Sequence, residues 1–273
     1  MVGQLINTGL RPMKIGVVGG GWNGCHLAIE MKKEGHEVEV FEKLSDIFEG
    51  VSGKFGIRLH KGPHYPRSKS TRDSCHASFD KFRDLYPELV IDHEHAIYAQ
   101  GELDALGNPS KVSAKSFGEV CEESPGSYSL NLENSGFEQL QVAYELDEPS
   151  IAVGHRLRNF FRARLSDSSI KLHLNTSVEK LTRDNGMTVM TDSQGNSRIF
   201  DVVINATAYR SLVPDDIGQA LPVDIDVTYQ TCIALCYEDT TPQDKPLSFI
   251  VMDGWFPCVS RPDISRYIGD LTC

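Results

Sequence analysis

The sequence lacks the features that mark membrane, secreted and repetitive proteins. No stretch approaches the roughly 18 consecutive apolar residues that a transmembrane helix needs, so no membrane-spanning segment is expected. Residues 1–13 carry no charged region followed by an apolar run, and so they do not resemble a signal peptide. There is no internal repeat and no low-complexity block. These absences favour a soluble globular protein.

The sequence also lacks an excess of basic residues and has no CxxC cysteine pair. The formal net charge is −11, which disfavours nucleic acid or a membrane surface as the partner, because either would need a basic face. The seven cysteines are scattered without a CxxC pair, as in a reducing compartment, so we expect a cytoplasmic protein. An anionic ligand must therefore be bound by local groups.

What the sequence does contain, in its 273 residues, is enough chain for one large or two interleaved domains. Near its start lies a pattern of strand, glycine turn, helix and strand. The two strands are predicted at Lys14 to Val18 and at Glu37 to Phe41, and the helix at Trp22 to Lys33. This is the order of a nucleotide-binding βαβ unit.

The glycine turn fits the GxGxxG pattern at Gly19, Gly21 and Gly24. In such a turn the first glycine makes the tight bend, the second lets the backbone approach a pyrophosphate, and the third permits close helix packing. The diphosphate then lies on the N–H groups at the positive end of the helix. Glu42 ends the second strand, where a carboxylate accepts hydrogen bonds from a ribose diol and would repel a 2′-phosphate, so NADP is disfavoured. A glycine-rich turn without a ligand is the alternative.

Further elements follow from periodicity and turn residues. Helices are predicted at 73–85 and 150–165, and a sheet-rich insertion at 91–144. Gln194 to Asn196 indicates a hairpin turn, and Val202 to Ile204 a fully buried strand. Late strands are predicted within 227–238 and 247–256.

Four segments, in this order, resemble FAD-dependent oxidoreductases of the D-amino acid oxidase, glycine oxidase and sarcosine oxidase type. They are the glycine loop with Glu42, "EGVSGKFG", "NTSVEKL" and "VVINATA". The resemblance covers about residues 14–67 and 153–210. It implies an α/β fold in which a sheet-rich (α+β) substrate-binding domain is inserted into a Rossmann-type FAD-binding domain. The implied ranges are 13–87 and 150–213 for the FAD-binding domain, and 88–149 and 214–273 for the substrate-binding domain.

The resemblance implies FAD as the cofactor, bound in an extended conformation. Its pyrophosphate would lie on the glycine turn, its adenosine ribose at the end of the second strand, and its adenine against the backbone of Val178. A segment after the second strand would line the pyrophosphate and ribityl path, and the late strand end would pack beside the cofactor. The implied cofactor-binding residues are Gly19, Gly21, Gly24, Glu42, Lys43, Ser52, Gly53, Arg58, Val178, Ala206 and Thr207.

One departure from the family pattern concerns the end of the chain. The family continues into a further FAD-contacting glycine–aspartate segment and a helix, whereas Gly269-Asp270 lies only three residues from the end of this sequence. A shortened chain, a diverged chain and a chain completed by a partner are the alternatives. The expected partners are a small-molecule substrate and either a second copy of the chain or a completing partner chain.

The densest polar constellation is "RLHKGPHYPRSKSTR", from Arg58 to Arg72, which glycine and prolines make a shaped loop. We interpret Arg67 as an anion clamp, because its guanidinium offers a planar fork to a carboxylate or phosphate. His60 and His64 are interpreted as flavin or substrate contacts that can exchange a proton, and Tyr65 as a hydrogen-bonding wall. A solvated basic loop is the alternative. No metal site is expected, since nothing fixes a third ligand.

The function predicted from these residues is an FAD-dependent oxidoreductase that oxidises a C–N or C–OH bond of a small anionic substrate by hydride transfer to flavin. "HKGPHY" is similar to a segment of UDP-galactopyranose mutases, which supplies a flavin isomerase of a sugar nucleotide as an alternative. A catalytically inactive, shortened flavoprotein scaffold that acts by binding is another.

Overall fold

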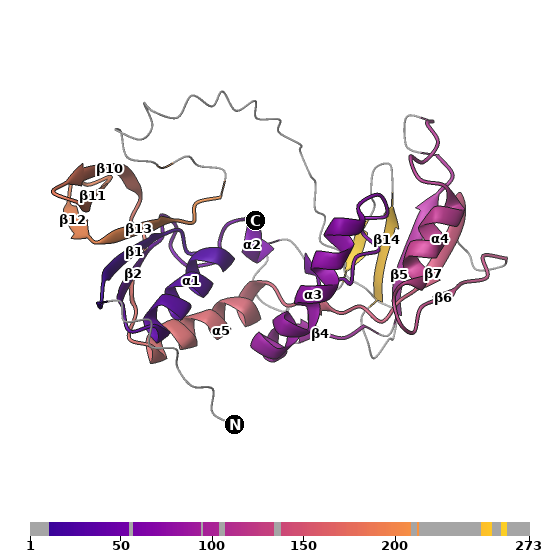
Figure 1. Cartoon of the computed structure of the whole chain (residues 1–273), viewed down its shortest axis with the longest axis horizontal. Coiled ribbons are helices and arrows are strands. Elements are labelled where there is room, and N and C mark those ends of the chain that lie inside the picture. The colour runs from indigo at the N-terminus through magenta and orange to yellow at the C-terminus, as the bar shows by residue number, and fades with distance from the viewer. Residues whose placement is uncertain are drawn as a thin grey trace. The chain divides into compact units, whose positions relative to one another are not determined.

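The computed structural model describes residues 11–54, 57–93, 95–103, 107–133, 138–208, 212, 247–252 and 258–260 (Figure 1). They fall into two compact units, which are described separately. Unit 1 comprises the described residues of Met1–Phe55 and Gly154–Cys236, and unit 2 those of Gly56–Val153 and Tyr237–Cys273. The strand predicted within 227–238 lies outside the described residues, as do most of residues 214–273.

Unit 1 is built around a parallel sheet of four strands in the order β13-β1-β2-β9. Helices α1 and α5 pack together on one side of this sheet, and the antiparallel sheet β10-β11-β12 lies on the other (Figure 1). The elements of unit 1 are β1 (Lys14–Val18), α1 (Trp22–Lys33), β2 (Glu37–Phe41), α2 (Val51–Lys54), α5 (Gly154–Asp167), β9 (Lys171–His173), β10 (Val178–Asp184), β11 (Met187–Asp192), β12 (Ser197–Phe200) and β13 (Val202–Asn205).

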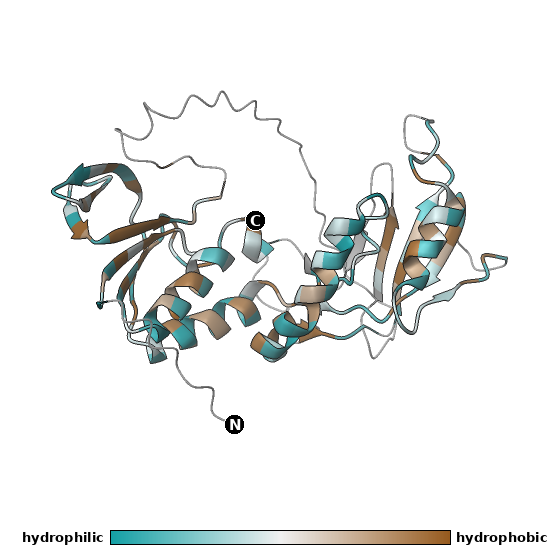
Figure 2. Ribbon diagram, viewed as in Figure 1, coloured by the Kyte–Doolittle hydropathy of each residue, from teal (hydrophilic) through white to brown (hydrophobic). Residues whose placement is uncertain are grey.

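The two sheets of unit 1 enclose an apolar cluster. Phe200 is fully buried, Met190 is 1% exposed, and both pack with Val18 and Phe41 from the parallel sheet. Full burial of one such large side chain contributes about 2 kcal/mol. In Figure 2 the strands of the parallel sheet are predominantly hydrophobic, as strands covered on both faces should be. The predicted α/β class with a Rossmann-like domain is confirmed.

Several predicted elements of unit 1 are confirmed, including both strands and the helix of the βαβ unit and the hairpin at Gln194 to Asn196. Two predictions are wrong in part. The helix predicted at 150–165 begins only at Gly154, because Ser150–Ile151 forms a short strand that pairs with two others. The strand at Val202 is not fully buried: Val202 is 38% exposed, because among the described strands β13 forms an edge of its sheet.

Unit 2 is rich in sheet; its first segment, Gly56–Val153, lies between the two segments of unit 1, and its second, Tyr237–Cys273, follows them. Its main sheet has the order β15-β14-β5-β7-β6, and a smaller one the order β3-β8-β4. Helix α4 packs on one face of the main sheet, where Phe117 and Cys121 meet Tyr98 and Tyr144. The elements of unit 2 are β3 (Ile57–Arg58), α3 (Lys69–Leu85), the 3₁₀ turn η1 (Pro87–Leu89), β4 (Val90–Ile91), β5 (His95–Gly101), α4 (Ala114–Glu122), β6 (Tyr128–Ser129), β7 (Leu140–Glu145), β8 (Ser150–Ile151), β14 (Leu247–Met252) and β15 (Cys258–Ser260).

Helix α3 begins earlier than the predicted start at residue 73. Ser68 is its N-cap, and the Ser68 side chain accepts a hydrogen bond from the N–H of Thr71. The helix is largely hydrophilic, as Figure 2 shows, and only Arg72 and Phe79 are buried on it. Helix α3 and the loop before it pack within unit 2. Within the described part of the chain, no helix combines the length and apolar character needed to span a bilayer.

Candidate functional site

The glycine turn between β1 and α1 leaves no room for side chains at two positions. Gly19 has φ +111°, and a Cβ there would lie 2.6 Å from the carbonyl oxygen of Ala206. A Cβ at Gly24 would lie 1.8 Å from the carbonyl oxygen of Gly19. Because real Cβ atoms do not approach oxygen so closely, helix α1 can start against the turn only with glycine at position 24.

The backbone N–H groups in the first turn of α1 are not capped by an acidic side chain of that turn. Gly21 is the N-cap and has no side chain to accept a hydrogen bond, and the first turn contains no acidic residue. The hydroxyl of Ser52, on α2, accepts a long hydrogen bond from the N–H of Trp22 at 3.3 Å. Gly53, the next residue of α2, packs so closely that a Cβ would lie 1.8 Å from the carbonyl oxygen of Phe48. Ser52 therefore borders the N-terminal end of α1, and Gly53 packs against the loop at Phe48.

Glu42 lies directly beside the glycine turn and is only 8% exposed. Its Oε2 accepts a hydrogen bond from the N–H of Gly20 at 2.6 Å, and its Oε1 from the N–H of Leu44 at 2.9 Å. Each carboxylate oxygen has a second lone pair, so these bonds orient the carboxylate and leave acceptor capacity for a diol. The next residue, Lys43, is exposed.

The other implied cofactor residues of unit 1 lie on segments that touch this turn. The N–H of Ala206 donates to the carbonyl of Val18 at 2.8 Å, which places the carboxyl end of β13 against the turn. Thr207 follows and is half-buried, with its hydroxyl donating to Asn205. Val178 is 2% exposed and its side chain packs in the apolar cluster, so only its main chain is left for a ligand.

Helix α5 holds the loop that follows Glu42. Asp46 lies 2.8 Å from Nε of Arg162 and 3.6 Å from Nε of Arg158. The N–H of Phe48 donates to the carbonyl of Gly20 at 3.0 Å. The loop is thus joined to both the helix and the glycine turn. Together, a side-chain-free turn, a helix N-terminus without acids and an oriented carboxylate fit a dinucleotide with a free ribose diol.

The polar loop predicted as the chemical site lies in unit 2, where Arg72 holds it in place. The Arg72 guanidinium forms an ion pair with Glu123 of the α4 region, with Nε 2.9 Å from Oε2 and Nη2 3.1 Å from Oε1. Its Nη1 donates to the carbonyls of Tyr65 and Pro66 at 3.3 and 3.2 Å. Gly62, with φ +124°, packs against Arg72, because a Cβ there would lie 2.8 Å from that of Arg72.

The loop brings His60, His64 and Tyr65 together. The two imidazole rings are stacked with centroids 5.3 Å apart, and the Tyr65 ring lies 5.5 Å from His60 and 5.4 Å from His64. Burial, the neighbouring His64 and the Arg58 cation lower the pKa of His60 to about 4. Burial and Arg58 also lower the pKa of His64. Both rings are therefore neutral at pH 7, and their Nδ1 atoms are buried without a hydrogen-bond partner among the described residues.

Arg58 lies next to the two histidines, at the end of β3. Its Cζ lies 4.8 Å from the centroid of the Tyr98 ring, a cation–π arrangement. Its three guanidinium nitrogens are shielded from solvent and make no hydrogen bond to any described residue. Glu148 is 4% exposed and accepts the N–H of Lys61 at 2.7 Å; burial raises its pKa, while nearby Tyr98, Arg58 and Lys61 act in the opposite direction.

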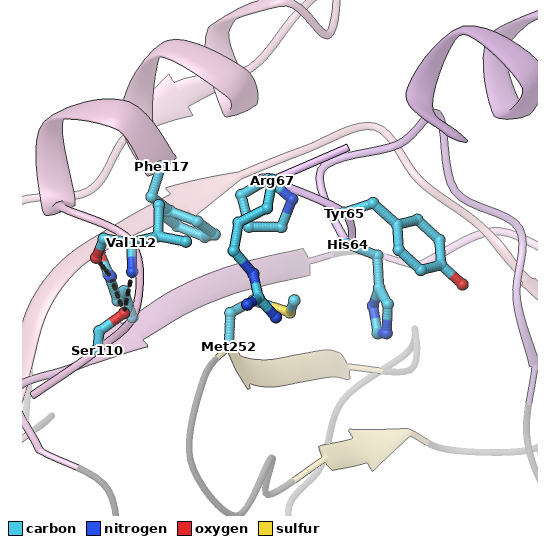
Figure 3. A pocket seen from close by; sticks show the side chains of 9 residues that line it. His64, Tyr65, Arg67, Ser110, Val112, Phe117 and Met252 are labelled. Atoms are coloured by element: carbon cyan, nitrogen blue, oxygen red, sulfur yellow. Dashed lines mark hydrogen bonds between the residues drawn. The ribbon is translucent and has the colours of Figure 1, made fainter. Parts of the chain in front are cut away.

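Beside the loop lies a cavity of about 220 Å³. His64, Tyr65 and Arg67 line one part of it, and Gln100 of β5 lines another. Figure 3 shows the Arg67 side chain extending toward Met252, while the Tyr65 hydroxyl points away from Arg67. The remaining lining residues are Pro66, Ser110, Val112, Phe117 and Met252.

The sequence analysis did not single out Tyr98, Gln100 and Glu148. For the first two a signal existed, because alternation along "HAIYAQG" places Tyr98 and Gln100 on one face of a strand that is otherwise apolar. A polar residue at an inward position of such a strand needs a partner. Glu148 follows β7 and meets the polar loop only through tertiary packing, which local pattern does not reveal.

Comparison with known proteins points to one family. The profile of the family described as "FAD dependent oxidoreductase" matches residues 14–263. The "FAD-dependent monooxygenase kojA" of Aspergillus flavus is 61% identical over 249 residues, which are 90% of this chain and 58% of that protein. The "FAD-dependent monooxygenase FPY4" of Fusarium mangiferae is 29% identical over 84% of this chain and 56% of its own length.

A solved structure supports the fold. Glycine oxidase from Geobacillus kaustophilus superposes with a TM-score of 0.57 at 17% identity, over 72% of this chain and 55% of that one. The chain thus spans less than two thirds of the length of these relatives. The family match and the FAD-dependent relatives indicate FAD as the cofactor, as the sequence predicted. The chain belongs to the family of FAD-dependent oxidoreductases.

Proposed function

We propose that the protein oxidises a C–N or C–OH bond of a small anionic substrate, with FAD held by unit 1 and the substrate by the cavity of unit 2. The single observation that carries this proposal is the β1–α1 turn. Gly19 and Gly24 leave its backbone free of side chains, and the buried Glu42 carboxylate lies beside it. Family membership supports it, and favours it over the isomerase alternative. FAD, when bound, supplies the acceptor for the two electrons and the hydrogen removed from the substrate.

In this proposal unit 1 binds FAD and orients it. The N–H groups of the first turn of α1 offer donors and the positive end of the helix dipole to the diphosphate. Glu42 accepts from the adenosine ribose, and the hydrogen bonds from Gly20 and Leu44 keep its carboxylate in position. Ser52 and Ala206 border the same turn and limit where the cofactor can lie.

Unit 2 supplies charge and proton acceptors. Arg67 lines the cavity with an exposed guanidinium, which suits a carboxylate or another anionic group of the substrate. His64 lines the cavity and is neutral at pH 7, so a ring nitrogen is available to accept a hydrogen bond or a proton from a substrate amine or hydroxyl, while His60 stacks on it and its low pKa keeps that ring neutral. Arg58 is a fixed buried cation that stabilises negative charge developing nearby.

The first test is a substrate screen on the flavin-loaded protein. Under anaerobic conditions, small amino acids and hydroxy acids are added and the visible flavin absorbance is followed. The proposal predicts bleaching by at least one anionic substrate, and weaker bleaching after Arg67→Met. Full FAD occupancy without bleaching by any of these acids would instead support the scaffold alternative, in which the protein acts by binding.

A second candidate reaction is monooxygenation, which the names of the relatives in Aspergillus and Fusarium favour. The two reactions differ in the fate of oxygen. Oxidation of a C–N or C–OH bond with oxygen as acceptor releases hydrogen peroxide and leaves no atom of dioxygen in the product. Monooxygenation places one labelled atom in the product when the reaction is run under ¹⁸O₂, and mass spectrometry separates the two outcomes.

A further inference from the structure

Gln100 is the most deeply buried polar residue of the cavity. It lies on β5, is 1% exposed, and lines the cavity beside Arg67. Its amide nitrogen donates to the hydroxyl of Ser110 and to the main-chain carbonyl of Val112. Its Oε1 is buried and has no hydrogen-bond partner among the residues that the structure describes. The side chain therefore has both donors satisfied and a shielded acceptor without a described partner.

The chemistry of the neighbours fixes the orientation of this amide. The carbonyl of Val112 can only accept, so the NH₂ group of Gln100 must face it, and exchanging oxygen and nitrogen would oppose two acceptors. The N–H of Val112 in turn donates to the hydroxyl of Ser110 at 3.1 Å (Figure 3). The open atom is thus an acceptor, and a buried acceptor without a partner is unfavourable unless a ligand supplies a donor.

The remaining walls of the cavity complete a simple recognition pattern. Arg67 contributes a cation, whereas Val112, Phe117 and Met252 contribute apolar surface. A ligand that satisfies all three parts has an anionic group, a compact apolar body, and a hydroxyl or N–H group directed at Gln100.

We propose that Gln100 determines substrate specificity by requiring a hydroxyl or N–H donor on the substrate. This inference rests on the proposed function in one respect, namely that the cavity is the substrate site. An analogue without the donor leaves Oε1 unpaired on binding and is rejected, which is a stronger form of selection than apolar fit alone.

The inference is tested with matched probe compounds and direct binding. Calorimetry compares 3-hydroxybenzoate with 3-fluorobenzoate, and 4-hydroxybenzoate with 4-fluorobenzoate, because fluorine has nearly the size of a hydroxyl and donates no hydrogen bond. We expect the hydroxyl compound of at least one pair to bind about tenfold or more tightly than its fluoro counterpart. Equal affinities in both pairs, or no binding of any of the four compounds, would overturn the inference.

Two variants test which residue causes the preference for the hydroxyl compound. Gln100→Met keeps the length of the side chain and removes the acceptor, so the affinity ratio within the selective pair should fall to about one. Arg67→Met should weaken both members of a pair alike and leave their ratio unchanged. A ratio that survives Gln100→Met contradicts the inference. If Gln100→Met does not fold, the affinity ratio measured with the unaltered protein tests the inference, because the two compounds of a pair differ in whether they carry a hydrogen-bond donor.

The visible spectrum of the same samples separates this inference from the proposed function. If the protein binds FAD and shows no preference for the hydroxyl compounds, the role of Gln100 is wrong and the flavoprotein assignment stands. If the preference is present and FAD does not bind, Gln100 selects a ligand in a protein that is not a flavin oxidoreductase.

Discussion

At the scale of single residues, the cofactor cradle depends on the absence of a side chain at Gly19 and at Gly24. A Cβ at Gly24 would meet the carbonyl oxygen of Gly19 at 1.8 Å, and a Cβ at Gly19 would meet that of Ala206 at 2.6 Å. Neither contact involves a flexible side chain that could move aside. Backbone on both sides must therefore shift before any other residue fits, and the shift would displace the N-terminus of α1, where a diphosphate would bind.

The first prediction concerns this contact. Gly24→Ala should lower the amount of FAD bound per protein by about tenfold or more, although alanine is favoured over glycine inside a helix by about 1 kcal/mol. Visible absorbance relative to protein concentration measures the effect. Gly50→Ala is the matched control, because a Cβ at Gly50 meets nothing within 4 Å. If Gly24→Ala and Gly50→Ala retain FAD equally, the cradle does not hold the cofactor.

A second residue-scale prediction follows from His60. Its pKa is lowered from 6.5 to about 4 in the folded protein, so the unfolded chain takes up a proton first as the pH falls. The free energy of unfolding is therefore unaffected by His60 above pH 6.5 and decreases between pH 6.5 and 4. A shift of this size corresponds to a loss of about 3 kcal/mol across that interval.

Denaturant unfolding at pH 7 and at pH 4.5 checks this effect. The His60→Asn variant should lose less stability between the two pH values than the unaltered protein, because asparagine does not titrate. His76→Asn, which alters an exposed histidine of the same unit, serves as the control for a histidine-to-asparagine substitution. Identical pH dependence in all three proteins would show that His60 is not buried as described.

At the scale of elements, contacts with α3 hold the polar loop in place, in addition to its own glycine and prolines. Arg72 of α3 donates to the carbonyls of Tyr65 and Pro66 and forms an ion pair with Glu123. Both carbonyls belong to the loop that carries His64 and Arg67. Arg72 is therefore a positioning residue, and its effect on the cavity is transmitted through the loop backbone.

We predict that Arg72→Met destabilises the protein by about 2 kcal/mol, because it leaves the half-buried carbonyls of Tyr65 and Pro66 without this donor and removes the ion pair with Glu123. Chemical unfolding measures the change. Lys69→Ala, on the same helix, removes an exposed pair with Asp73 and should change the free energy of unfolding far less than Arg72→Met does. Comparable losses for the two variants would mean that the Arg72 contacts contribute no more than a surface pair.

The secondary-structure elements also show which parts of the fold could be predicted from the sequence. The βαβ unit and the hairpin were predictable, because hydrophobic period, glycine and turn residues are local signals. Ser150 was misplaced in a helix because its strand forms only by pairing with residues 58 and 91, which lie far away in the chain. The grouping of His60, His64 and Tyr65 was predicted as a loop, whereas the packing of Tyr98 near His64 and the hydrogen bond from Lys61 to Glu148 join segments that are distant in the chain.

At the scale of the whole molecule, the chain divides its proposed tasks between two units that alternate along the sequence. Unit 1 contains the side-chain-free turn and Glu42, and unit 2 contains the cavity with Arg67 and Gln100. We propose that these units correspond to the cofactor domain and the substrate domain inferred from the sequence. Residues 56–153 of unit 2 separate the two segments of unit 1 in the sequence.

The measurement that tests the account most directly is the visible absorption spectrum of the purified protein, recorded before and after incubation with FAD and removal of unbound cofactor. The account predicts the absorption bands of a flavin that remain with the protein, together with stabilisation against thermal unfolding by FAD. A protein that stays colourless after incubation and unfolds at the same temperature with and without FAD would contradict it.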